Sequence, residues 1–217
     1  MTRPLPPTAS IAEMDEDGRL FAPSAARNRD VLASVVQRFA PAQGRALELA
    51  SGTGQHVVAF ASACPNLIWV PTEIDPERRA SISAYVQEAQ LTNLSFPVHL
   101  DAAAPGWSAT TGAVDFIVLV NLLHLISAPE AETVIQETCA ALAPRGRALF
   151  YGPFTRGGAL TSEGDARFHA SLCEADPAIG YKDDADVARW FEQAGAPVTQ
   201  IIEMPANNLV FVCEKPE

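Results

Sequence analysis

Strand-like and helix-like segments alternate along the chain from residue 45 to residue 151, and this alternation limits the possible folds more than any other feature. The clearest strand is Ala113–Asn121, which is almost continuously apolar, as is typical of a parallel strand covered on both faces. The other strands expected here are Arg45–Ala50, Leu67–Thr72, Leu94–Leu100 and Arg147–Tyr151. The expected helices are Arg27–Phe39, Gln55–Ala63, Pro76–Gln90 and Pro129–Leu142. This alternation predicts an α/β fold with a parallel sheet and helices on both faces.

The last part of the chain predicts a different strand arrangement. After a helix expected over Asp184–Ala194, strands are expected at Val198–Met204 and Leu209–Glu214. Only residues 205–208 link these two strands, which is too short for a parallel crossover, so they should form an antiparallel hairpin. A Rossmann-like sandwich with a mostly parallel seven-stranded sheet and a C-terminal antiparallel hairpin is typical of class I methyltransferases. Ordinary dinucleotide-binding domains usually stay parallel throughout.

The length of 217 residues suits a single domain with its own core. We expect residues 1–20 to form a flexible N-terminal segment, because they begin rich in proline and small residues, and residues 21–217 to form the domain. The segment that runs from Phe154 to about Asp183 is expected to be long and irregular. Segments of that kind often close over a pocket.

Composition argues against several classes of function. The net charge of −11, with only 15 scattered basic residues, argues against a nucleic-acid-binding surface. No apolar run reaches the ~20 residues of a membrane span, and the N-terminus lacks the apolar region of a signal peptide. The four cysteines are widely spaced without a CxxC pair, which predicts reduced thiols and no metal site. We therefore expect a cytoplasmic protein that acts on a small molecule and binds neither membrane nor nucleic acid.

A glycine loop after the first strand carries the strongest functional signal. It reads Glu48-Leu49-Ala50-Ser51-Gly52-Thr53-Gly54-Gln55-His56. Its glycines let the backbone approach a ligand, and the amides of the following helix favour an anion. A dinucleotide fingerprint would require a third glycine where Val57 stands, whereas Glu48 before the loop matches the methyltransferase pattern. The loop therefore predicts S-adenosylmethionine (SAM) as the cofactor, with binding residues Glu48, Ser51, Gly52, Thr53 and Gly54.

Polar residues also stand at the ends of the next three strands. Glu73 ends the second strand and can accept hydrogen bonds from both ribose hydroxyls, with Asp75 as its substitute. Asp101 ends the third strand, where it can accept a hydrogen bond from the adenine amino group. Asn121 ends the fourth strand, next to the expected place of the sulfonium. In an open parallel sheet ligands bind outside these carboxyl ends, so the four side chains are predicted to face SAM.

Four short sequence motifs resemble those of the methyltransferase-like 26 family, a largely uncharacterised group with the class I methyltransferase fold. They are Ala26–Asp30, Leu47–His56, Tyr151–Phe154 and Met204–Asn208. The resemblance runs from about Phe21 to Val212 and implies SAM as the ligand, but it implies no particular acceptor. Two places depart from the family pattern: Ala26 stands where an acid precedes the Arg-Asn pair, and Thr161–His169 replaces a Thr-Ser-x-Ser-Asn-x-x-Phe-Asp run.

Candidate catalytic residues lie at the ends of the fourth and fifth strands. His124, Tyr151 and Asn121 are predicted to act there, His124 with a structural alternative because a lone histidine among apolar neighbours often serves a buried hydrogen bond. Methyl transfer is an in-line displacement, so placing the nucleophile contributes much of the rate, and a base helps only where the acceptor loses a proton. The predicted substrate-binding residues are Arg27, Asn28 and Asn207. His56 follows the glycine loop in the first turn of a helix, where a capping or packing role is as plausible as a functional one.

The sequence supports one leading function and two alternatives. The leading prediction is a SAM-dependent methyltransferase with a small-molecule acceptor. The second is a non-catalytic SAM sensor or partner-binding protein, motivated by the departures at Ala26 and Gly164–His169. The third, an NAD(P)-dependent oxidoreductase, is disfavoured by Val57 and by the closing hairpin.

Overall fold

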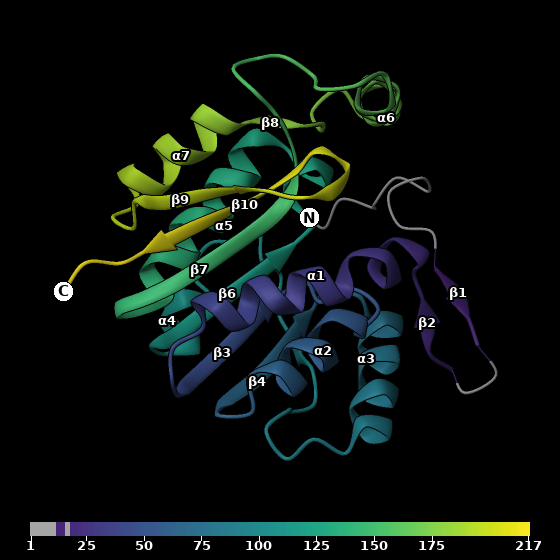
Figure 1. Cartoon of the computed structure of the whole chain (residues 1–217), viewed down its shortest axis with the longest axis vertical. Coiled ribbons are helices and arrows are strands. Elements are labelled where there is room, and N and C mark those ends of the chain that lie inside the picture. The colour runs from purple at the N-terminus through teal and green to yellow at the C-terminus, as the bar shows by residue number, and fades with distance from the viewer. Residues whose placement is uncertain (1–11, 16–17) are drawn as a thin grey trace.

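The computed structural model describes residues 12–15 and 18–217. Figure 1 shows one central sheet between two layers of helices. Seven strands follow the order β5-β4-β3-β6-β7-β10-β9, and the short β8 pairs with the end of β7. The bounds of these strands are β3 Gly44–Leu49, β4 Leu67–Glu73, β5 Val98–His99, β6 Val114–Val120, β7 Leu142–Thr155, β8 Lys182–Asp183, β9 Val198–Glu203 and β10 Asn208–Glu214.

The strand directions confirm the predicted fold class. Strands β5, β4, β3, β6 and β7 run parallel to one another, and β8 is parallel to β7. Strand β10 runs antiparallel to both β7 and β9. The strand order changes direction between the neighbouring strands β3 and β6, which is where an open α/β sheet forms its crevice at the carboxyl ends of the strands.

The helices cover both faces of the sheet (Figure 1). One face carries α1 Pro23–Phe39, α2 Gln55–Ala63 and α3 Pro76–Ala89, and the other carries α4 Ser108–Thr111, α5 Ala128–Ala141 and α7 Asp184–Gln193. Helix α6 (Glu163–Ala175) lies beyond the end of the sheet, apart from both layers. Two single turns, η1 Leu123–Leu125 and η2 Pro205–Asn207, follow β6 and β9. None of the helices in the described ranges is long and apolar enough to cross a membrane.

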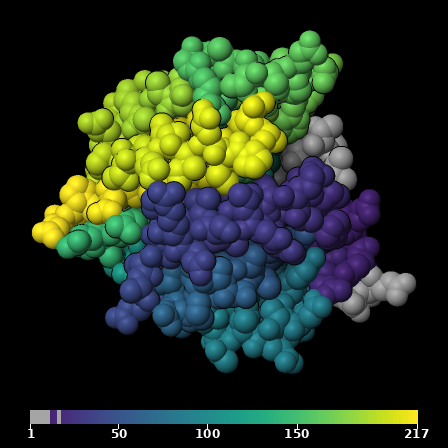
Figure 2. Space-filling view, viewed as in Figure 1, coloured from purple at the N-terminus to yellow at the C-terminus, as the bar shows by residue number. Residues whose placement is uncertain are grey.

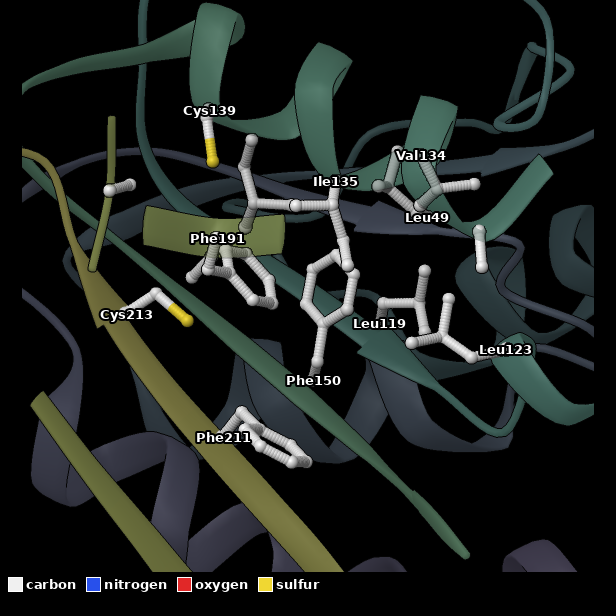
Figure 3. Close-up of a cluster of buried hydrophobic side chains, with 14 of the residues drawn as sticks. Leu49, Leu119, Leu123, Val134, Ile135, Cys139, Phe150, Phe191, Phe211 and Cys213 are labelled. Atoms are coloured by element: carbon white, nitrogen blue, oxygen red, sulfur yellow. The ribbon is translucent and has the colours of Figure 1, made fainter. Parts of the chain in front are cut away.

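Two hydrophobic cores hold these layers to the sheet. Figure 3 shows the core under α5 and α7, where Phe150 and Phe191 meet edge to face with ring centroids 5.0 Å apart. Cys139 and Cys213 point into the same core as reduced thiols. The second core lies under α1, α2 and α3, around the fully buried Trp69. On the face shown in Figure 2, α1 lies directly beside the C-terminal strands, so these distant parts of the chain share one core. Burying each large side chain contributes about 1.5–3 kcal/mol.

Local capping explains where the helices next to the crevice begin. Pro76 opens α3, and the Asp75 carboxylate accepts hydrogen bonds from the amides of Glu77 and Arg78. Helix α5 begins with a capping box in which Ser127 and Glu130 each bond the other's backbone amide. These caps fix the helix ends that face the carboxyl edge of the sheet.

Three predicted segments differ from the structure. The third strand, expected over Leu94–Leu100, is reduced to Val98–His99 and an isolated bridge at Leu94, because Pro97 has no amide to donate to the ladder. The fifth strand extends well beyond Arg147–Tyr151. Its residues 143–146 bulge out of the ladder, with Arg145 at φ 62°.

The segment after Phe154 is also more regular than predicted. It contains α6, whose N-terminal cap is Ser162, and the short strand β8. The apolar side chain that helix α6 buries fully is Leu172. Within the predicted flexible N-terminal segment, Glu13–Met14 (β1) pairs antiparallel with Leu20–Phe21 (β2), while residues 1–11 and 16–17 lie outside the described residues.

Candidate functional site

A cavity of about 590 Å³ opens at the carboxyl ends of the parallel strands. One part, which we call the loop end, is lined by the glycine loop and three acids: Glu48, Ser51, Gly52, Thr53, Glu73 and Asp101. The other part, the histidine end, is lined by residues from the end of β6, η1, β7, α6, the residue before β8 and the C-terminal hairpin: Asn121, His124, Pro153, Phe168, Tyr181 and Asn208. The cavity is large enough for an organic cofactor together with a small substrate.

The glycine loop needs left-handed backbone at three positions. Ala50, Gly52 and Gly54 have φ values of 50°, 59° and 98°. Ala50 adopts this conformation despite its Cβ, at a cost that a glycine would avoid. Gly52 faces the cavity, whereas a Cβ on Gly54 would stand 3.0 Å from the Cα of Ile82 in α3. Gly54 was predicted to bind the cofactor; it does not line the cavity, and it instead lets α2 pack closely on α3.

Glu48 is the least ordinary side chain of the loop end. It lines the cavity with 1% of its surface exposed, and its Oε2 is buried with no hydrogen-bond partner among the described residues. Burial raises the pKa of Glu48 to about 8, while Ser51 lowers it and the carboxylate of Glu73 raises it by smaller amounts. A buried oxygen without a partner costs free energy unless a ligand supplies a donor. The arrangement therefore favours a cationic donor such as an ammonium group.

Glu73 connects the loop to the second strand. Its Oε2 accepts a hydrogen bond from the Gly52 amide at 2.9 Å, and its Oε1 accepts from the amides of Ile74 and Asp75. The carboxylate is thereby held in place beside the cavity, and Oε2, which accepts only one of these bonds, still has acceptor capacity for a ligand hydroxyl. Asp101 also lines the cavity, and its Oδ1 accepts from the Ala103 amide. Asp75 does not line the cavity, because its carboxylate caps α3.

The histidine end is aromatic, and its histidine is uncharged. His124 is buried, and its ring makes edge contacts with Phe168 and Tyr181 at centroid distances of 5.7 and 6.2 Å. Burial, with a smaller effect from the Lys182 cation, lowers the pKa of His124 to about 3, so the imidazole is uncharged at neutral pH. Among the described residues, no side-chain hydrogen bond is made to this ring. Its nitrogens are therefore available to a bound molecule.

Asn121 and His124 approach the same point on β7. A Cβ on Gly152 would stand 3.7 Å from Asn121 Oδ1 and 3.9 Å from His124 Nδ1. A Cβ at this glycine would thus make ordinary van der Waals contact with both side chains and with Phe154. Asn121 has φ 57°, a left-handed conformation that asparagine tolerates better than most residues, and this turns its amide back over the strand end.

A second polar group of side chains lies on the opposite face of β7. Asn28 Oδ1 is 2.8 Å from His56 Nε2, and Asn28 Nδ2 donates to the Tyr151 hydroxyl at 3.4 Å. His56 lines the cavity, and burial, with a smaller effect from Arg29, lowers its pKa to about 4. Asn28 and Tyr151 lie behind His56 and do not line the cavity.

The remaining predicted residues also lie away from the cavity lining. Arg27 is exposed on α1. Asn207 turns its amide toward Asp165, to which its Nδ2 donates at 3.0 Å, and its neighbour Asn208 lines the cavity instead. Sequence reasoning passed over Phe168 and Tyr181 because they lie in the segment that was expected to be irregular. It also passed over Arg78, which lines the loop end with its Nη1 3.6 Å from where a Gly52 Cβ would be.

A protein-family model matches nearly the whole length of the chain and identifies its family. Residues 19–215 match a family described as "Protein of unknown function (DUF938)". The chain belongs to this family. Its description supplies no activity, so the geometry of the cavity carries the functional reasoning.

Three solved structures with a similar fold are described as methyltransferases or methyltransferase-family proteins. An O-methyltransferase family protein from Burkholderia thailandensis superposes with a TM-score of 0.76 and 18% identity, covering 89% of this chain and 58% of that protein. An O-methyltransferase family 2 protein from Planctomyces limnophilus, in complex with apigenin, superposes with a TM-score of 0.73 and 17% identity, covering 88% of this chain and 60% of that protein. A methyltransferase of calicheamicin biosynthesis, bound to S-adenosylhomocysteine (SAH), superposes with a TM-score of 0.70 and 16% identity, covering 89% of this chain and 54% of that protein.

These comparisons establish the fold. At such identities the likeness concerns the arrangement of strands and helices. The chain spans less than two thirds of each of these structures. The shared part is the Rossmann-like methyltransferase sheet that the strand order also defines.

Proposed function

We propose that this protein is a SAM-dependent methyltransferase with a small-molecule acceptor. The observation that carries the proposal is Glu48, which lines the cavity toward the carboxyl end of β3 and whose Oε2 is buried without a partner among the described residues. An ammonium group in the cavity would supply the missing donor. The SAH-bound form of a structural neighbour with the same fold supports SAM as the source of that ammonium.

The residues of the loop end suit the other groups of SAM as well. The Glu73 carboxylate would hold the ribose hydroxyls, and Asp101 would accept from the adenine amino group. Ser51, Gly52 and Thr53 would lie against the amino-acid portion, and the free amides at the start of α2 suit its carboxylate. The acids around the loop end complement the net positive charge that the sulfonium gives SAM.

The histidine end would hold the acceptor. SAM supplies a methyl group activated by the sulfonium, so the protein's own task is to place the nucleophile and to accept its proton. His124 is uncharged and has a free lone pair, so it can take that proton. A weak base suffices because the proton becomes strongly acidic as the acceptor atom forms its new bond. Asn121 would orient the acceptor beside His124.

The proposal also includes the chemical class of the acceptor and the resemblance to the methyltransferase-like 26 family. A net charge of −11 and an aromatic pocket favour a small uncharged molecule over a nucleic acid, and we propose a cytoplasmic location for the enzyme. The resemblance to the methyltransferase-like 26 family is supported by the motifs Leu47–His56, Tyr151–Phe154 and Met204–Asn208, since each contributes residues to this cavity or borders it.

Two measurements test the proposal. Isothermal titration calorimetry should show that the purified protein binds SAM and SAH, and an absence of binding would refute it. Labelled SAM incubated with the protein and a cell-extract metabolite pool should then label a small molecule. Binding without any transfer would favour the SAM-sensor alternative.

A further inference from the structure

Asp165 in the first turn of α6 receives hydrogen bonds from three separate segments. Its Oδ2 accepts from Thr161 Oγ1 at 2.8 Å, from Ser162 Oγ at 2.6 Å and from Asn207 Nδ2 at 3.0 Å. Its Oδ1 accepts from the Tyr181 hydroxyl at 3.2 Å. Only 9% of the residue is exposed. One carboxylate thus joins the start of α6, the residues before β8 and the tip of the C-terminal hairpin.

These joined segments form the wall of the histidine end. Phe168 in α6, Tyr181 before β8, and Ala206 and Asn208 at the hairpin tip all line the cavity. The rings of Phe168 and Tyr181 also pack on each other at 6.1 Å and on His124. The Tyr181 hydroxyl on Asp165 therefore fixes the ring that contacts the candidate base. Asp165 itself does not line the cavity.

The ionised state of the Asp165 carboxylate suits a stable connection between the three segments. Burial by itself raises the pKa of Asp165, but the hydrogen bonds from Ser162, Thr161, Asn207 and Tyr181 hold that pKa below its usual value. The side chain is therefore a carboxylate that accepts from every partner. Hydrogen bonds to a charged group contribute more than those between neutral groups.

We propose that Asp165 is the positioning residue of the acceptor pocket: it holds Tyr181 against His124 and the hairpin tip in the cavity wall, and so sets the shape that an acceptor meets. This inference rests on the proposed function for the identity of the acceptor. The connection between the three segments can be tested without any acceptor.

Hydrogen–deuterium exchange of the free protein tests the connection. In Asp165→Ala, exchange should rise by about tenfold or more in residues 177–182 and 204–208, because both segments lose their anchor. Tyr181→Phe should raise exchange only in 177–182, and Asn207→Ala only in 204–208. Asp165→Asn should stay within about threefold of the wild type, because its amide oxygen can keep the Oδ2 partners while its NH₂ donates to the Tyr181 oxygen.

Glu163→Ala is the matched control, since Glu163 is an exposed acid in the same helical turn. The proposal is overturned if Asp165→Ala exchanges like Glu163→Ala in both segments. It is equally overturned if exchange rises uniformly through β3 and β6, because Asp165 would then serve the whole fold and not the pocket wall.

Ligand measurements separate this proposal from the proposed function. Asp165→Ala should bind SAH within about twofold of the wild type, and once an acceptor is identified its KM should rise by about tenfold while the KM for SAM stays unchanged. A fall in kcat with an unchanged acceptor KM would contradict the positioning role. If the wild type binds no SAH, the methyltransferase proposal fails, whereas the exchange pattern still decides whether Asp165 joins the three segments.

Discussion

The loop end of the cavity takes most of its side chains from residues 48–56 and from the strand that follows, whereas the histidine end is assembled from segments spread between residues 121 and 208. The loop end is acidic and held by backbone hydrogen bonds, as in the contact between Glu73 and the Gly52 amide. The histidine end is aromatic, and its segments are connected by side chains. A site for a fixed cofactor can be built from backbone, while a site for a particular acceptor depends on side chains that can vary.

The largest effect should come from the backbone of the loop end. Gly52→Val should reduce SAH binding by at least about a hundredfold, because a β-branched residue is strained at φ 59° and the added atoms approach Arg78. Calorimetry measures the loss. Gly157→Val is the control, since Gly157 has φ 58° with open space around its Cβ position, and it should bind SAH normally. Binding by Gly52→Val within tenfold of the wild type would show that the loop does not hold the cofactor.

The next effect should separate the two ends. His124→Asn should lower methyl transfer by about 10² to 10⁴ while leaving SAH affinity unchanged, because it removes the proton acceptor without touching the loop end. The measurement compares kcat with SAH affinity in the same preparation. A parallel loss of both would place His124 in cofactor binding, and an unchanged kcat would leave it a structural role.

A smaller and pH-dependent effect should come from Glu48. Glu48→Gln should weaken SAH binding by about ten- to a hundredfold. The wild type should release close to one proton on binding at pH 7, since the free protein holds a pKa of about 8 and an ammonium favours the ionised form. Calorimetry in buffers of different ionisation enthalpy measures that proton. Equal proton release by wild type and Glu48→Gln would contradict the assignment.

The same variant should gain stability in the absence of ligand. The folded pKa of Glu48 lies above its unfolded value, so its favourable contribution is complete below about pH 4.5 and declines as pH rises toward 8. Glu48→Gln should therefore unfold at a higher temperature than the wild type at pH 8, and the difference should shrink toward pH 5. Thermal unfolding across this range checks the sign.

The smallest effect should come from Tyr151. Tyr151→Phe should leave methyl transfer within about threefold of the wild type and lower the free energy of unfolding by about 0.5–1.5 kcal/mol, because the hydroxyl makes one long bond to Asn28 behind the cavity. Kinetics and denaturant unfolding measure the two quantities. A loss of transfer as large as that of His124→Asn would restore Tyr151 as a catalytic residue.

The sequence by itself determined the sheet, the hairpin and the acids of the loop end. These depend on local signals: apolar runs, short connections, glycines, and polar residues at strand ends, all of which act through neighbours along the chain. Glu48, Glu73 and Asp101 line the cavity because each follows or ends a strand whose direction the pattern predicts. Asp75 shows the limit of that reasoning, because the same position also caps α3, and only the folded backbone shows which role the carboxylate takes.

Only the tertiary structure decided the histidine end. Phe168, Tyr181 and Asn208 are far apart in sequence, and no local pattern relates them to His124. Their meeting depends on α6 packing beyond the sheet and on the bonds from Tyr181 and Asn207 to Asp165. Tyr151 and Gly152 make the same point within one strand: alternate residues of β7 point to opposite faces, so the tyrosine lies behind the cavity while the Cβ position of the glycine faces Asn121 and His124.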